Sequence, residues 1–96
     1  MDAPPKINWK TLDDLETSLR DFQRDYQESA GDAVRRRRLR EVVIKTKDRA
    51  RFASRNRKAA PEKRAAKEEM VRWMLVWLDD PALFADWVTL RRARSG

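Results

Sequence analysis

The side chains best suited to chemistry are the basic ones, and they are concentrated in the middle third of the chain. Residues 33–67 hold 15 Lys or Arg against 3 Asp or Glu, whereas the net charge is −4 over residues 1–32 and −1 over residues 68–96. Arginine guanidinium groups match the geometry of phosphate oxygens, and a dense row of cations binds a polyanion mainly by displacing its counterions. The middle third therefore predicts a surface for nucleic acid, or for an acidic protein, with little sequence specificity.

We expect nine of these cations to make the contacts, on one long helix or directly after it. They are Arg35, Arg36, Arg37, Arg38, Arg40, Lys45, Arg51, Arg55 and Lys58. Consecutive helical residues point about 100° apart, so the four arginines in a row cannot all face the carboxylates of a neighbouring helix. Some of them must project into solvent. The alternative is a solvated face that the acidic first third of the chain partly neutralises.

Residues for catalysis or metal binding are scarce. The chain has no histidine and no cysteine, which removes the commonest general base and the usual zinc ligands. The pairs Asp13–Asp14 and Asp79–Asp80 match no calcium-binding loop, and helix capping accounts for both. The serines have no histidine to activate them. We therefore expect a non-enzymatic protein with no catalytic residue, metal, cofactor or small-molecule substrate.

Three of the four tryptophans lie between Met70 and Leu90, in the most apolar stretch of the chain. Met70, Trp73, Met74 and Trp77 share one face of a helix, and Val and Leu side chains spread over its other sides. A helix that is apolar all round must be covered by other elements. We therefore expect this helix to form the core, with its tryptophans packed among apolar side chains instead of stacking on bases.

The same stretch suggests a second function, because one small chain has limited means of burying so much apolar surface. The expected partner contacts are Phe84, Trp87, Ile44 and Phe52, the last two lying off the main apolar face of their helix. This alternative is a protein-interaction or self-association module that uses apolar surface around residues 70–90, with a homodimer as one form. The role of Trp9 is left open: its side chain either closes the end of the bundle or protrudes as an anchor.

The elements that must position these residues are all helical. Only two glycines occur and strand-type alternation is absent, which predicts an all-α fold. Capping signals divide the chain into helices at about 9–30, 33–58, 61–78 and 81–92, a small three- to four-helix bundle with the Trp-rich third helix at its core. Asn8 and Thr11 compete as the N-cap of the first helix. Pro61 predicts the start of the third, and Asp80 before Pro81 predicts a break and restart.

The chain is short enough to form one domain. Residues 1–7, with a Pro-Pro pair, are expected to be a disordered tail before a single helical domain at 8–94. The N-terminus has the features of neither a secretory signal nor a transit peptide, and no apolar run reaches the roughly 20 residues that span a bilayer. We expect an intracellular protein, cytoplasmic or, in a eukaryote, nuclear, that does not enter a membrane.

Overall fold

The computed structural model describes residues 5–95 and confirms the predicted all-α bundle. Its elements are α1 (Leu12–Glu28), α2 (Ala33–Ser54), α3 (Pro61–Asp79), the short 3-10 helix η1 (Pro81–Leu83) and α4 (Phe84–Ser95), and the described range contains no strand. Residues 1–4 of the expected tail lie outside the described residues, and residues 5–7 precede the first helix without regular structure. No helix within residues 5–95 is long and apolar enough to cross a membrane.

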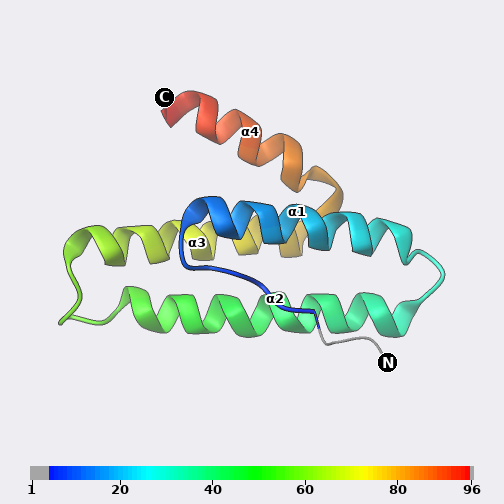
Figure 1. Ribbon diagram of the computed structural model, residues 1–96, viewed down its shortest axis with the longest axis horizontal. Helices are drawn as coiled ribbons and strands as arrows, with labels where there is room; N and C mark the ends of the chain where they lie inside the picture. Colours follow the sequence, from blue (N-terminus) through cyan, green and yellow to red (C-terminus); the bar gives the residue numbers. More distant parts are fainter. Residues whose placement is uncertain (1–4, 96) are drawn as a thin grey trace.

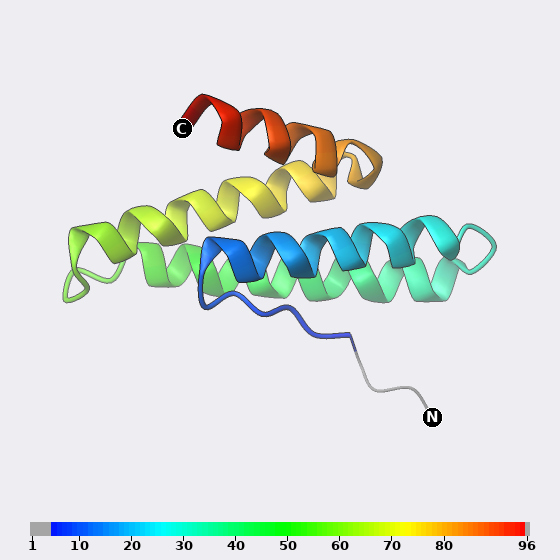
Figure 2. The same cartoon turned by 45° about the horizontal axis from the view of Figure 1, so that its top comes forward.

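Three of the helices lie side by side, and the fourth folds back over two of them. α2 and α3 run antiparallel over most of their length, and α1 packs over both (Figures 1 and 2). α4 covers α1 and α3 on the side away from α2. α1 begins, and α4 ends, well inside one end of the α2–α3 pair. The loop that joins α2 to α3 therefore projects beyond both of them (Figure 1).

A side-chain cap fixes the start of α1. Thr11 Oγ1 accepts a hydrogen bond from the Asp14 backbone N–H at 3.1 Å, so Thr11 is the N-cap that the chain uses. The Asn8 side chain instead accepts from the Lys10 N–H at 3.2 Å, within the segment that precedes the helix. Of the two competing start signals the chain uses Thr11, and α1 begins at Leu12, three residues after the approximate start at residue 9.

The end of α2 comes four residues before the predicted boundary at residue 58. Past the last helical residue, the Arg55 N–H bonds to the Phe52 carbonyl at 3.2 Å, and this i→i+3 contact tightens the final turn. The Asn56 side chain then accepts from the Lys58 N–H at 3.0 Å. Residues 55–60 are therefore a loop, which changes where the cations of this segment point.

The predicted boundaries on either side of α3 are confirmed. Pro61 occupies the first turn of α3, where its missing N–H has no helical partner to lose. The Asp80 carboxylate accepts from the Ala82 N–H at 3.0 Å and so caps η1. The chain reverses through η1, which lets α4 pack back over α1 and α3.

The core is centred on Trp77, whose side chain is completely buried. Its indole Nε1 donates to the Leu19 carbonyl at 3.1 Å, and the rings of Phe22 and Tyr26 meet it edge-on at centroid distances of 6.3 and 5.7 Å. The surrounding buried side chains are Leu15, Leu19 and Phe22 of α1, Leu39, Val43 and Ala50 of α2, Met70, Val71, Trp73 and Met74 of α3, and Phe84 and Val88 of α4. The prediction that the Trp-rich helix forms the core is confirmed.

Candidate functional site

Two arginines of the predicted nucleic-acid surface cap the ends of other helices. Arg36 Nε donates to the Tyr26 carbonyl at 2.8 Å, and its guanidinium lies 4.3 Å from the centroid of the Tyr26 ring. Arg40 Nη1 donates to the Leu78 carbonyl at 3.0 Å. Both carbonyls belong to the last turns of their helices, α1 and α3, where backbone oxygens lack helical partners and the helix dipole favours a cation. These two arginines therefore have structural roles inside the bundle.

Arg35 joins α2 to α1 by an ion pair. Its guanidinium donates to the Asp25 carboxylate at 2.5 and 3.3 Å. The hydrogen bond from Arg35 outweighs burial and holds the pKa of Asp25 below its ordinary value. Other α1 carboxylates pair within α1 or with α4: Glu16 with Arg20, Asp21 with Arg24, and Asp13 and Glu16 with Arg92. Within the described residues, the acidic helix therefore reaches only the first turn of α2 with an ion pair.

The other six predicted cations lie along α2 and in the loop after it. Arg37, Arg38, Lys45, Arg55 and Lys58 are exposed, and Arg51 is half-buried. Arg37 and Arg38 are close to the turn between α1 and α2, whereas Arg55 and Lys58 lie in the loop at the opposite end. The predicted surface therefore extends along α2 from Arg37 and Arg38 to the loop, with Lys45 and Arg51 between the two ends.

A group of six exposed cations runs along the second half of α2, through the loop and into the first turn of α3, and we call it the basic tip. It consists of the exposed residues Lys45, Arg49, Arg55, Arg57, Lys58 and Lys63. Lys45 and Arg49 lie along the second half of α2, Arg55, Arg57 and Lys58 lie in the loop that projects beyond α1 and α4 (Figure 1), and Lys63 lies in the first turn of α3. Across the described residues, none of the six side chains has an ion-pair partner. Of the two carboxylates in this segment, Asp48 pairs with Lys47 at 3.1 Å and Glu62 is exposed.

Half of the basic tip was missed by the sequence prediction. Arg49, Arg57 and Lys63 were part of the basic segment but not among the nine expected contacts. The helical spacing held a usable signal for one of them, because Arg49 follows Lys45 by four residues and so shares its side of the helix. The loop positions held no such signal, since they depend on where α2 ends.

The outer side of α2 also carries two of the four predicted partner contacts. Phe52 is 82% exposed and follows Arg49 by three residues, and Ile44 is exposed at 37%. Trp87 lies on α4, which covers the side of α1 and α3 away from α2. The structure therefore does not bring the predicted partner contacts together on one surface.

An apolar groove lies between α3 and α4. It has a volume of 590 Å³, with Leu75, Val76, Leu83, Trp87 and Leu90 as its apolar lining and Arg72, Asp79, Asp80 and Asp86 at its polar positions. Leu75, Leu83 and Leu90 are exposed, and Trp87 is half-buried. Phe84 was predicted as a partner contact, and that prediction is wrong. Its side chain is completely buried because η1 turns it into the core. Its neighbour Leu83 faces outward instead.

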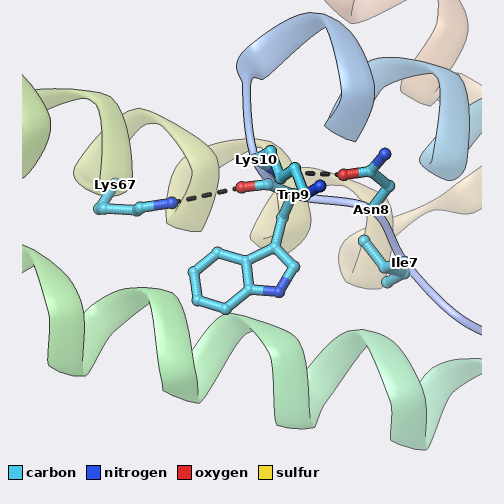
Figure 3. Close-up of a pocket in the computed structure, with 5 residues that line it drawn as sticks. All are labelled: Ile7, Asn8, Trp9, Lys10 and Lys67. Carbon is cyan, nitrogen blue, oxygen red and sulfur yellow. Dashed lines mark hydrogen bonds between the residues drawn. The ribbon is translucent and has the colours of Figure 1, made fainter.

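Trp9 holds the segment before α1 against the bundle. Lys67 Nζ donates to the Trp9 carbonyl at 3.2 Å and lies 4.3 Å from the centroid of its ring, while the indole extends toward α2 (Figure 3). Burial lowers the pKa of Lys67. The adjoining hollow of 360 Å³ is lined by Ile7, Asn8, Trp9, Lys10 and Lys67. Trp9 is half-buried against the core, so it closes this side of the bundle and does not protrude as an anchor.

The described residues therefore present two surfaces suited to binding a partner. The basic tip offers positive charge and an exposed aromatic ring, and the α3–α4 groove offers apolar side chains beside aspartates. Within residues 5–95, no three Asp or Glu side chains gather as a metal-binding group. Comparisons with protein-family models, with curated proteins and with solved structures found no significant match for this chain.

Proposed function

We propose that this chain is a non-enzymatic nucleic-acid-binding module that contacts phosphates through the basic tip. The observation that carries the proposal is the difference between two groups of cations. Arg35, Arg36 and Arg40 are engaged by a carboxylate and by helix-end carbonyls, whereas the tip cations are exposed and lack ion-pair partners among the described residues. Clustered charges of one sign attract a polyanion and raise its rate of association.

The expected binding is strongly salt-dependent and weakly sequence-specific. Phosphate contacts release counterions and carry no direct sequence information. Each neutralised phosphate contributes about −0.7 on a single strand, or about −0.9 on a duplex, to the slope of log affinity against log salt concentration. If all six tip cations contact phosphates, the slope is about −4 on a single strand and about −5 on a duplex.

A salt titration of binding tests this proposal. Labelled duplexes and single strands of mixed sequence and equal length are titrated with the full chain, and fluorescence anisotropy reports binding. We expect binding at low salt that weakens with the slopes given above, and similar affinities for unrelated sequences. Absence of binding at low salt, or binding that added salt leaves unchanged, would overturn the proposal.

Protein interaction through the α3–α4 groove is the second candidate function. The observation that favours it is the exposure of Leu75, Leu83 and Leu90, at 43%, 57% and 65%, beside the half-buried Trp87. Fully burying a leucine side chain is worth about 1.5–3 kcal/mol, so a partner that covers all three gains a substantial free energy of binding. Exposed apolar surface of this kind is typical of interaction sites.

Sedimentation velocity at several protein concentrations tests whether a second copy is that partner. Self-association predicts a sedimentation coefficient that rises with concentration, and Leu83→Asp should remove the rise. Because Leu83 is exposed, the substitution should leave the fold intact, which circular dichroism checks. A wild-type chain that stays monomeric at every concentration would exclude self-association.

A further inference from the structure

Phe52 is the one aromatic side chain that the described part of the chain leaves exposed. Trp73, Trp77, Phe22 and Phe84 are buried, and the remaining aromatic residues are half-buried. Phe52 is 82% exposed, although a phenyl ring gains free energy when it leaves water. Its position in the last turn of α2 places it within the basic tip, and not beside the groove between α3 and α4.

Cations precede and follow the Phe52 ring along the chain. Arg49 lies three residues before it and Lys45 seven residues before it, so all three side chains project from one side of α2. Arg55 follows at the helix end, where its N–H bonds to the Phe52 carbonyl at 3.2 Å. Each of these three cations is exposed and lacks an ion-pair partner among residues 5–95. The ring therefore sits within a row of groups that can hold successive phosphates.

An exposed ring placed between cations favours binding of an unpaired strand over binding of a duplex. In a duplex the faces of the bases stack on one another, so a side chain on a convex helix surface meets phosphates and groove edges. Unpaired bases can turn outward and stack on an aromatic ring while their phosphates stay in a basic groove or row. A cationic row alone would serve either form of nucleic acid, whereas an exposed ring adds binding free energy only where base faces are free.

We propose that the basic tip binds single-stranded nucleic acid, with Phe52 stacking on an unpaired base while Lys45, Arg49 and Arg55 hold the flanking phosphates. This inference rests on the proposed function and adds the class of nucleic acid. Every base has a face that can stack, so the contact is sequence-tolerant and agrees with the weak sequence preference expected of phosphate binding. Duplex binds through the same cations but without the contribution of the ring.

The test compares two probes that carry equal charge and differ only in their bases. One is an oligothymidylate of about 15 nucleotides, within the range of known single-strand site sizes, and the other is an abasic sugar-phosphate strand of the same length. The wild-type chain should bind the oligothymidylate more tightly. Phe52→Ala should weaken that binding roughly fivefold or more and leave the abasic affinity unchanged, because base stacking is lost and the phosphate contacts remain.

Three further variants separate stacking from other effects. Phe52→Trp should keep the preference for the probe with bases, and Phe52→Leu should lose it, because leucine is apolar but has no ring to stack. Val34→Ala is the matched control: Val34 is 70% exposed on α2, close to the opposite end of the helix. It should leave both affinities unchanged. Since these side chains are exposed, every variant should fold, which circular dichroism verifies.

The outcomes distinguish this inference from the function on which it rests. Equal affinities for the two probes, both weakened by salt, would overturn the stacking role of Phe52 and leave phosphate binding in place. An equal loss of both affinities in Phe52→Ala would do the same. If neither probe binds at low salt and a duplex of the same length does not bind either, both proposals fail, and the exposed ring is then better explained as a contact for a protein partner.

Discussion

Arg38 and Arg40 lie two residues apart on α2 and meet different surroundings. Arg40 reaches a carbonyl in the last turn of α3, whereas Arg38 is exposed and has no ion-pair or side-chain hydrogen-bond partner in the described part of the chain. Two helical positions rotate a side chain by about 200° around the axis, which separates the two roles. The sequence predicts that some arginines of the run face solvent. It does not predict which, because that depends on which helix ends lie beside α2.

Replacing Arg40 should therefore destabilise the fold, and replacing Arg38 should not. Arg40→Ala removes a charged donor from the Leu78 carbonyl, and we expect a loss of about 1 kcal/mol in the free energy of unfolding. Arg38→Ala changes the same residue type on the same helix and should stay within about 0.5 kcal/mol of the wild type. Urea denaturation measures both. Equal effects of the two substitutions would contradict the capping role of Arg40.

The candidate site could be predicted only in part from its residues. Lys45, Arg55 and Lys58 were expected contacts and belong to the basic tip, while Arg35 was expected and is held by Asp25. The charge of a side chain is visible in the sequence, but its pairing is not. Pairing is set by long-range packing, which decides which carboxylates and carbonyls a cation can reach.

Among the elements, three of the four helix starts were predictable from local caps, and helix ends were less predictable. The starts at Asp32, Pro61 and Asp80 depend on caps that act within a few residues, so the local sequence is sufficient. α2 ends at Ser54 although the next proline is Pro61, and the intervening residues show no strong stop signal. It was also hard to predict which side chains beside η1 are buried. A 3-10 turn is tighter than an α-helical turn, so it alters which neighbouring residue faces the core.

The contact between α3 and α4 includes a charged cluster around Glu69. Its carboxylate accepts from Arg91 at 2.5 and 2.7 Å, from Arg72 at 3.0 Å and from the Trp73 indole at 3.1 Å. These partners, Arg91 foremost, hold the pKa of Glu69 below its ordinary value of 4.5 despite burial. Between the folded-state pKa of Glu69 and its ordinary value of 4.5, the Glu69 carboxyl binds more protons in the unfolded chain than in the folded chain. The stabilisation is therefore complete above pH 4.5 and is lost as the pH falls through the folded-state pKa.

Glu69→Gln should consequently cost more stability at neutral pH than in acid. We expect a loss of about 1 kcal/mol near neutral pH, since the carboxylate is partly exposed, and a smaller loss below the folded-state pKa of Glu69. Glu68→Gln is the matched control, because Glu68 is exposed and has no ion-pair partner within the described residues. Urea denaturation at both pH values gives the comparison. An unchanged cost of Glu69→Gln across this pH range would contradict the linkage.

At the scale of the whole molecule, the fold separates charges that the sequence places next to each other. The acidic α1 sends Asp13 and Glu16 to Arg92 of α4, on the side away from α2. The loop of the basic tip lies at the end that neither α1 nor α4 covers. The overall charge of +7 is therefore unevenly distributed over the surface, and we predict that the position of the cations, not the net charge, controls binding to nucleic acid.

The most direct measurement compares two variants that each lose three exposed cations. One carries Arg49→Gln, Arg55→Gln and Lys58→Gln in the basic tip, and the other carries Arg37→Gln, Arg38→Gln and Arg94→Gln, which are exposed and lack ion-pair partners among the described residues. The affinity of each for an oligothymidylate is titrated against salt.

We predict that the tip variant binds more weakly and that its log–log salt slope is smaller in magnitude by about 2, the value for three lost phosphate contacts on a single strand. The second variant should keep the wild-type slope. Equal losses in the two variants, or no loss in the tip variant, would contradict the assignment of phosphate binding to the basic tip.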